Sequence, residues 1–206
     1  MVAQPAAIIQ GWIPGQAFGD ALADTLLGAV EPGGRLPLSM PRAEADAPVL
    51  HARPQGGGLV YAEGLLVGYR GYDRDGVEPL FAFGHGLGYT SWEYVSLAAE
   101  SVAVNGELDV RVTVRNSGPR AGREVVQVYL ERPEDGPERP LRTLGAFGIV
   151  DAGPGKQVEV RMTIPARAFM RFDETARDWA PRGGAYTIWA GRSSRDLRLN
   201  LRVEVG

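Results

Sequence analysis

The chain has 206 residues, of which 44% are hydrophobic, with a net charge of −3 and a pI of about 5.5. It has no basic block that would attract a phosphate backbone, and no apolar run approaches the ~20 residues of a membrane span. The absence of cysteine excludes disulfides and thiolate metal sites but selects no cellular compartment. We therefore expect a folded protein without nucleic-acid or membrane partners.

Residues 1–47 are predicted to form a β-α unit. The apolar run Ala6–Ile9 predicts a buried strand, and residues 16–30 predict an amphipathic helix with Phe18 and Leu22 on one face. A single unit of this size is too small to bury both faces of a sheet. The chain starts without the basic segment and long apolar core of a signal peptide, and it starts inside an element, which suggests that further sequence precedes it.

Residues 48–95 are irregular and rich in glycine and aromatic residues, and the stretch "LLVGYRGY" within them predicts one short strand. The segment "FAFGHGLGYTSWEY" has neither helical nor strand periodicity. Gly84, Gly86 and Gly88 permit close approach of the backbone, and the aromatic rings would each bury a large area. We therefore predict a connector clamped between two packed bodies. The residues expected to pack at this seam are Tyr69, Phe81, Phe83, His85, Tyr89 and Trp92.

Residues 96–206 alternate between apolar and polar side chains. In "ELDVRVTVRNSG", for example, Leu108, Val110 and Val112 share one face while Asp109 and Arg111 share the other. Seven such segments, separated by turns rich in glycine and proline, predict a mainly β fold with an immunoglobulin-like or fibronectin III-like sandwich. The Cys–Trp–Cys core of antibody domains is missing, so this relation concerns architecture only.

The residues alone assign no catalytic centre. His51 and His85 are far apart and no H-E-x-x-H motif occurs, so we expect no metal site and no cofactor. A G-x-S-x-G elbow is also missing, which removes support for a serine hydrolase. Glycoside hydrolysis needs two carboxylates. Glu63 and Asp73 flank the aromatic-rich segment, but the sequence does not pair them.

Several blocks resemble glycoside hydrolase family 3, the β-glucosidase and β-xylosidase family. "AAIIQGWIPGQAFGDALADTLLGAVEPGGRLPLSMP" resembles the late part of that family's second domain, and "EGLLVGYRGYD" with "EPLFAFGHGLGYTSWEY" resembles its connector. "VRNSGPRAGREVVQVYL" and "RPLRTLGAFGIVDAGPG" resemble its C-terminal fibronectin type III-like domain. The departures are small: Gly88 replaces the usual Ser, Trp92 replaces the usual Phe, and the carboxylate that often follows Gln16 is lacking.

The resemblance implies a parent enzyme that hydrolyses terminal β-linked sugars with retention, through a glycosyl-enzyme intermediate. In that family the nucleophile lies on a TIM-like barrel and the acid/base on an earlier part of the second domain, so no catalytic residue is carried over. The resemblance implies a structural chain that braces the barrel and α/β domains, which are its partners together with the parent's carbohydrate substrate, and that is inactive alone. By analogy, Trp12 and Gln16 reach the rim of the substrate pocket.

Two other interpretations remain open. Pyranose rings stack on aromatic side chains, so the chain is alternatively a non-catalytic carbohydrate-binding or adhesion module. It is otherwise a natural small subunit that completes a separately encoded barrel chain. In each case the apolar face of the β-α unit has lost its sheet neighbours, and we expect it to fold back on the sandwich, to form a homodimer or to be mobile.

Overall fold

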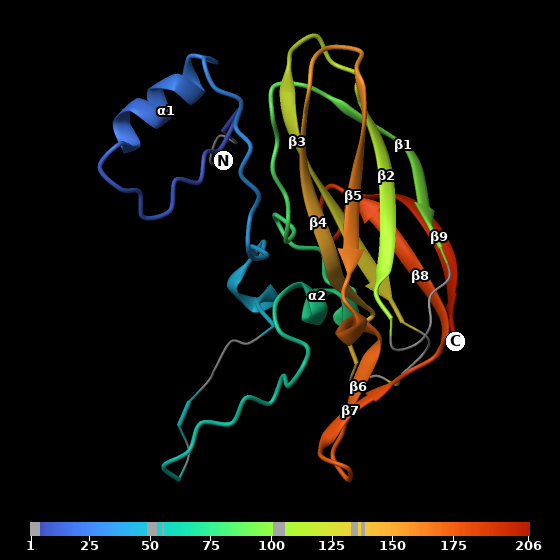
Figure 1. Cartoon of the computed structure of the whole chain (residues 1–206). Coiled ribbons are helices and arrows are strands. Elements are labelled where there is room, and N and C mark those ends of the chain that lie inside the picture. The colour runs from blue at the N-terminus through green and yellow to red at the C-terminus, as the bar shows by residue number, and fades with distance from the viewer. Residues whose placement is uncertain (1–4, 49–52, 55, 101–105, 133–135, 137–138) are drawn as a thin grey trace.

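The protein is a two-layer β-sandwich with a limb of helices and extended chain along one side (Figure 1). We call residues 5–90 the limb. The predicted mainly β class with a sandwich is confirmed. The computed structural model describes residues 5–48, 53–54, 56–100, 106–132, 136 and 139–206.

The sandwich consists of a three-stranded sheet in the order β1-β2-β5 and a four-stranded sheet in the order β4-β3-β8-β9, and all the pairings are antiparallel. All seven predicted segments contribute a strand, although the first strand begins at Trp92, earlier than predicted. Trp92 thereby belongs to the sandwich. The strands are β1 (Trp92–Ala99), β2 (Leu108–Asn116), β3 (Gly122–Glu131), β4 (Arg142–Ala152), β5 (Gln157–Ile164), β8 (Gly184–Gly191) and β9 (Leu197–Val205).

The core lies between the two sheets and follows the alternation in the sequence. Val110, Val112 and Val114 of β2 have no exposed surface, and they face Val126 and Val128 of β3, which have none either. Burying a side chain of this size contributes about 1.5–3 kcal/mol. A sandwich with this core therefore has its own stabilising interior.

A hairpin that the alternation did not predict projects from the base of the sandwich (Figure 1). It consists of β6 (Met170–Asp173) and β7 (Asp178–Pro181). Its turn is fixed by the Asp173 carboxylate, which accepts hydrogen bonds from the backbone N–H groups of Thr175 at 2.8 Å and Ala176 at 3.1 Å. Asx turns of this kind depend on side-chain contacts, and a search for alternation does not detect them.

The predicted first helix is present as α1 (Phe18–Leu26), but the predicted strand at Ala6–Ile9 is not formed. A strand needs a neighbour for its backbone hydrogen bonds, and no described strand lies beside this segment. α1 stands away from the sandwich and buries none of its residues (Figure 1). No helix among the described residues is long and apolar enough to cross a membrane.

The stretch predicted as a short strand, "LLVGYRGY", instead leads into the helix α2 (Tyr69–Asp75). Gly68 and Gly76 flank this helix with φ values of +59° and +63°, a conformation that glycine adopts without strain. The helical period places Tyr69 and Asp73 on one face, toward the sandwich, which explains why tertiary packing overrides the strand pattern. The limb also contains a short 3₁₀ helix at Glu44–Asp46.

Candidate functional site

Backbone hydrogen bonds join the connector to residues 5–41, which we call the N-terminal arm. The N–H of Leu36 donates to the carbonyl of His85 at 2.9 Å, and the N–H of Gly84 donates to the carbonyl of Leu36 at 2.8 Å. Met40 and Phe81 form an isolated antiparallel bridge further along. Two segments that are distant in the sequence therefore form one ribbon, which runs along the outer face of the four-stranded sheet (Figure 1).

The three glycines of the connector lie where side chains have no room. A Cβ at Gly84 would overlap the side chain of Gln127 on β3, and Gly84 also has a φ of +80°. A Cβ at Gly86 would overlap the carbonyl of Gly34, and one at Gly88 would overlap the carboxylate of Glu31. The glycines therefore bring the connector against the sandwich and the arm together.

Gln127 joins the connector to the sandwich. Its Nε2 donates to the carbonyls of Gly84 at 3.0 Å and of Arg192, while its Oε1 accepts a hydrogen bond of 2.7 Å from the hydroxyl of Tyr129. Gln127 is only 3% exposed, although it points out of the four-stranded sheet. The amide is thus satisfied by partners on both bodies, as a buried polar group requires.

Aromatic rings fill the adjacent part of the seam. Tyr69 stacks on Phe83 with the ring centroids 4.8 Å apart, and it meets Tyr129 of β3 edge-on at 6.1 Å. The N–H of Leu144 on β4 donates a hydrogen bond of 2.9 Å to the Tyr69 hydroxyl. Aromatic pairs of this geometry contribute about 0.5–1.5 kcal/mol beyond the area they bury.

A buried ion cluster anchors the arm in the sandwich. Glu124 of β3 has no exposed surface, and its carboxylate lies 3.4 Å from Arg35 of the arm and 3.3 Å from Arg192. The hydroxyl of Tyr94 lies 3.4 Å from the same carboxylate. Burial, reinforced by the Glu124 charge, raises the pKa of Tyr94, which therefore stays protonated and able to donate.

A second buried carboxylate ties α2 to the sandwich. The side chain of Asp73 is 1% exposed, and it lies 3.3 Å from Arg195 and 4.0 Å from Arg142. Burial raises the pKa of Asp73, and the two arginines oppose this shift. Arg195 also donates to the carbonyls of Tyr72 at 3.1 Å and Val77 at 3.0 Å, so one side chain secures the middle of the helix and the residues that follow its C-terminus. We interpret Asp73 as a structural anchor.

Both ion clusters depend on the turn between β8 and β9, residues 192–196. Besides Arg192 and Arg195, this turn contributes the N–H of Ser194, which donates to the carbonyl of Phe83 at 3.0 Å. Sequence analysis did not single out this turn. Its signal is two arginines beside two serines in "GRSSRD", between two predicted strands. Such a turn is ordinarily solvated, so only the structure identifies it as an anchor.

The predicted seam residues are partly brought together. Tyr69 and Phe83 face β3, whereas Phe81 stacks on His85 with centroids 5.4 Å apart. Burial, with help from the Arg192 and Arg35 charges, lowers the pKa of His85, so this side chain is neutral at pH 7.

Tyr89 and Trp92 lie outside this group of rings. The hydroxyl of Tyr89 donates to the carbonyl of Thr25 at 2.6 Å, which links the connector to α1. Trp92 is 5% exposed and belongs to the sandwich core.

The two predicted rim residues do not touch the seam. Trp12 is 50% exposed with a φ of +52°, and Gln16 is exposed just before α1. A positive φ in a residue other than glycine is uncommon and stores strain of about 1–3 kcal/mol. The backbone conformation at this turn thus keeps the Trp12 ring at the surface, half exposed to solvent.

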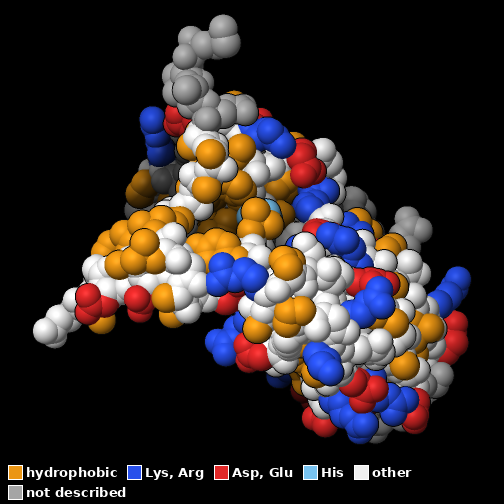
Figure 2. Space-filling model, turned by 90° about the horizontal axis from the view of Figure 1, so that it is seen from above, with side chains coloured by type: hydrophobic (Ala, Val, Ile, Leu, Met, Phe, Trp, Pro, Cys, Tyr) orange, Lys and Arg blue, Asp and Glu red, His pale blue; other side chains and the backbone are white. Residues whose placement is uncertain are grey.

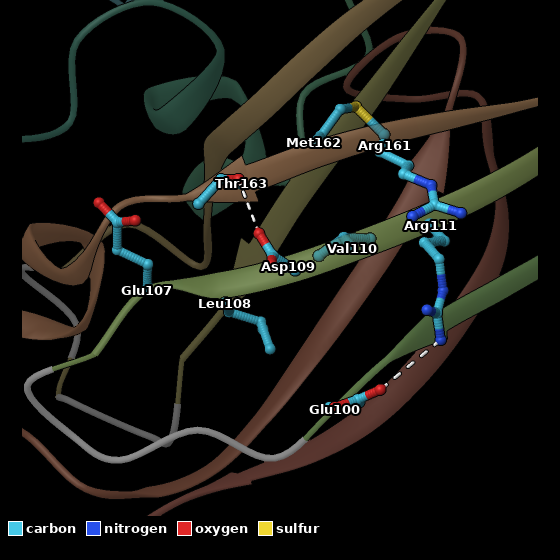
Figure 3. A pocket seen from close by; sticks show the side chains of 9 residues that line it. All are labelled: Glu100, Glu107, Leu108, Asp109, Val110, Arg111, Arg161, Met162 and Thr163. Atoms are coloured by element: carbon cyan, nitrogen blue, oxygen red, sulfur yellow. Dashed lines mark hydrogen bonds and ion pairs between the residues drawn. The ribbon is translucent and has the colours of Figure 1, made fainter.

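A surface hollow lies on the three-stranded sheet, away from the seam (Figure 3). Asp109 accepts a hydrogen bond of 2.7 Å from Thr163, and Glu100 forms an ion pair of 3.8 Å with Arg111. The described lining contains no aromatic ring on which a sugar would stack. Among the described residues, no group of three or more His, Asp or Glu side chains is arranged to hold a metal ion. The lining residues are Glu100, Glu107, Leu108, Asp109, Val110, Arg111, Arg161, Met162 and Thr163.

Comparison with known families agrees with this two-part anatomy. The profile of the glycosyl hydrolase family 3 C-terminal domain matches residues 2–89, and that of a fibronectin type III-like domain matches residues 124–194. The chain thus matches, in two separate segments, the C-terminal region of glycosyl hydrolase family 3 enzymes. The connector and the sandwich therefore correspond to segments that occur together in family 3 enzymes.

Two relatives named as β-glucosidases contain this region within longer chains. The thermostable β-glucosidase B of Acetivibrio thermocellus is 40% identical over 202 residues, which are 97% of this chain and 27% of that protein. The β-glucosidase BoGH3A of Bacteroides ovatus is 37% identical over 205 residues, 96% of this chain and 27% of that protein. The chain thus spans about a quarter of the length of the relatives it matches.

Solved family 3 structures share the fold of this region. The GH3 β-glucosidase of Bifidobacterium adolescentis superposes with a TM-score of 0.89 at 33% identity, over 95% of this chain and 29% of that chain. DesR, a β-glucosidase from Streptomyces venezuelae solved with D-glucose, gives a TM-score of 0.87 at 38% identity, over 95% of this chain and 26% of that chain. The limb and the sandwich are thus arranged here much as in these enzymes.

Proposed function

We propose that the chain is the structural C-terminal part of a retaining β-glucosidase, in which it braces the barrel and α/β domains and supplies no catalytic residue. The observation that carries this proposal is the distribution of exposed apolar side chains. On the face seen in Figure 2, hydrophobic side chains gather on the limb, while charged side chains of both signs are more numerous over the sandwich. The most exposed of them on the limb are Ile8, Ile13, Leu26, Leu27, Val60, Tyr61 and Leu87.

α1 supports this proposal most directly. It has only nine residues and buries none of them, and Leu27, which follows it, is 85% exposed. Isolated helices of this length are marginal in water, because most helical stability comes from packing of an apolar face. The face of α1 therefore requires a partner, and the remaining strands and helices of a family 3 α/β domain would provide one.

The contacts at the seam explain how the chain would hold a domain docked on the limb in a fixed position relative to the sandwich. Glu124 and Asp73, two buried carboxylates, fix the arm and α2 to a sandwich that has its own core. A body that docks on the limb would therefore also be fixed relative to the sandwich. The proposed division of the chain is residues 1–47 for the end of the α/β domain, 48–95 for the connector and 96–206 for the fibronectin III-like domain.

We also propose that Trp12 and Gln16 lie at the rim of the parent's substrate pocket. Both side chains are exposed on the turn that precedes α1, and Trp12 is held in a strained backbone conformation. Strain of this kind is often found at ligand sites. In an active assembly, Gln16→Ala is expected to raise KM several-fold, whereas Asp20→Ala, an exposed control on α1, leaves it unchanged.

A second candidate function rests on the projecting hairpin. Phe172 and Trp179 are 42% and 38% exposed, and their ring centroids are 5.6 Å apart. Exposed aromatic rings suit a carbohydrate-binding module. However, the guanidinium of Arg167 lies only 3.7 Å from the Trp179 centroid and covers one face of that ring. We therefore rank this function second, and oligosaccharide titration followed by Trp fluorescence tests it: a brace gives no saturable response.

The proposal is tested by joining the chain to a catalytic body. In one fusion, the chain replaces the matched segment of the A. thermocellus β-glucosidase, and turnover of an aryl β-glucoside is measured. We expect activity from the fusion and none from the chain alone. Turnover by the isolated chain, or a fusion that folds but is inactive, contradicts the proposal.

A further inference from the structure

β4 carries an apolar row on its outward face. Phe147 and Ile149 are 61% and 56% exposed, and they point away from the core because Ala146 and Val150, their neighbours in the strand, point into it. β4 is also an edge strand of the four-stranded sheet. These two large side chains thus lie uncovered on a stably folded body.

The outward rows of β2 and β9 have a different character. β2 presents Asp109, Arg111 and Arg115, and β9 presents Arg198 and Arg202. A sheet face in contact with water is expected to be polar. The sequence follows that rule on those strands and departs from it on β4, so solvent is not the expected neighbour of β4.

The apolar row begins where the seam ends. Phe147 is the direct cross-strand partner of Gln127, whose side chain is bound to the connector at Gly84. On the other side of Phe147, Leu144 of the same strand is bound to Tyr69 of α2. The connector therefore covers one half of this sheet face and leaves the half with Ile149 open.

We infer that Phe147 and Ile149 form a second docking point, directly on the sandwich, for the same barrel and α/β body that covers the limb. The inference rests on the proposed function. In the A. thermocellus relative the matched segment is 27% of the protein, so a large body is available to cover this row. The row also adjoins the connector, which would pass beneath that body.

The chemistry of the row does not suit other occupants. The surface of two side chains is far smaller than the ~800 Å² that each partner buries in a stable protein dimer. A sugar would find one ring, Phe147, beside an aliphatic Ile149 that offers neither stacking nor hydrogen bonds. A large complementary protein surface is therefore the occupant that fits.

The chain contains no cysteine, which permits a direct test. Single cysteines replace Phe147, Leu27 of the limb, or Val95, which is 42% exposed on β1 of the other sheet. Each variant is prepared as the isolated chain and as the fusion, and maleimide labelling of that cysteine is timed by peptide mass spectrometry. We expect labelling of Phe147→Cys to be at least about tenfold slower in the fusion, as for a buried site, and that of Val95→Cys to be unchanged.

The outcomes separate the inference from the proposed function. If Leu27→Cys is protected in the fusion and Phe147→Cys is not, the limb docks as proposed and the second docking point is refuted. If neither is protected, both proposals fail. If Phe147→Cys becomes protected in the isolated chain as its concentration rises, or on addition of oligosaccharide, a second copy or a sugar is the occupant and the inference is overturned.

A measurement on the isolated chain keeps the inference falsifiable even where the fusion does not fold. Phe147→Asp and Ile149→Asp are expected to lower its Tm no more than the control Val95→Asp, because more than half of each side chain is exposed. A large fall in Tm for either variant shows that the row serves internal packing, which overturns the inference.

Discussion

The side-chain amide of Gln127, in the middle of β3, donates a hydrogen bond of 3.0 Å to the backbone carbonyl of Gly84 in the connector. This contact works only because residue 84 has no side chain and adopts a φ of +80°. The glycine-containing segment at residues 84–88 therefore fits closely against the sandwich, and its contacts can be tested residue by residue.

Gly84→Ala is expected to destabilise the chain by about 3 kcal/mol, because it adds a steric clash with Gln127 to the cost of a positive φ. Gly155→Ala is the matched control: Gly155 has a φ of +69° in the turn between β4 and β5 but nothing within 4 Å of an added Cβ. The control should lose only about 1 kcal/mol. Urea unfolding measures both, and equal losses would show that no clash occurs at the seam.

Arg35→Met is expected to cost about 3 kcal/mol and to release the arm, because it leaves the buried Glu124 with one fewer cation. Arg123→Met provides the comparison, since the Arg123–Asp151 pair is half exposed and worth at most about 1 kcal/mol. Denaturant unfolding and limited proteolysis at residues 10–30 report the two effects. An arm that stays protease-resistant in Arg35→Met would argue against the ion cluster as its anchor.

Acidification is expected to destabilise the seam through His85. Burial lowers its pKa in the folded state, so the unfolded chain binds the proton more tightly, and stability is present above the usual pKa of about 6.5 and lost as pH falls through it. His85→Phe keeps the stack on Phe81 and removes this proton. Between pH 7.5 and 5.5 the wild type should lose more stability than the variant, by at most about 1.4 kcal/mol per pH unit. If the wild type and His85→Phe lose the same stability between pH 7.5 and 5.5, protonation of His85 is not the cause.

In the absence of its partner body, the isolated chain is expected to self-associate through the limb. Ile13 is fully exposed and Leu27 is 85% exposed, so Ile13→Asp with Leu27→Asp should reduce association while changing the unfolding free energy by less than about 0.5 kcal/mol. Sedimentation velocity over a range of concentrations measures the first quantity. A wild-type chain that stays monomeric at all concentrations would contradict the expectation.

The sandwich could be predicted from sequence because its signal is local. The alternation around Val110 specifies both the strand and its buried face, and β2 follows it without exception. The strand predicted at Ala6–Ile9 failed for the opposite reason, since a strand depends on a partner and this segment has none among the described residues.

The buried ion pairs that anchor the seam could not be predicted from the sequence, for a related reason. Glu124 lies 89 positions from Arg35, and before the fold is known nothing distinguishes this pair from solvated surface charges. Glu124 shares a strand face with Val126 and Val128, but a single glutamate in an apolar row does not show that its carboxylate is buried. Long-range ion pairs of this kind become visible only when packing shows which charges have lost water.

Backbone hydrogen bonds between Leu36 and His85, and the bridge between Met40 and Phe81, join the two ends of a long loop. Since the closure entropy of a loop grows only logarithmically, doubling the length of such a loop costs about 0.6 kcal/mol. Its length is thus free to vary between homologues without disturbing the sandwich. Insertions between Met40 and Leu66 are the natural place for a family 3 enzyme to diversify the shape of its outer surface while its joint stays the same.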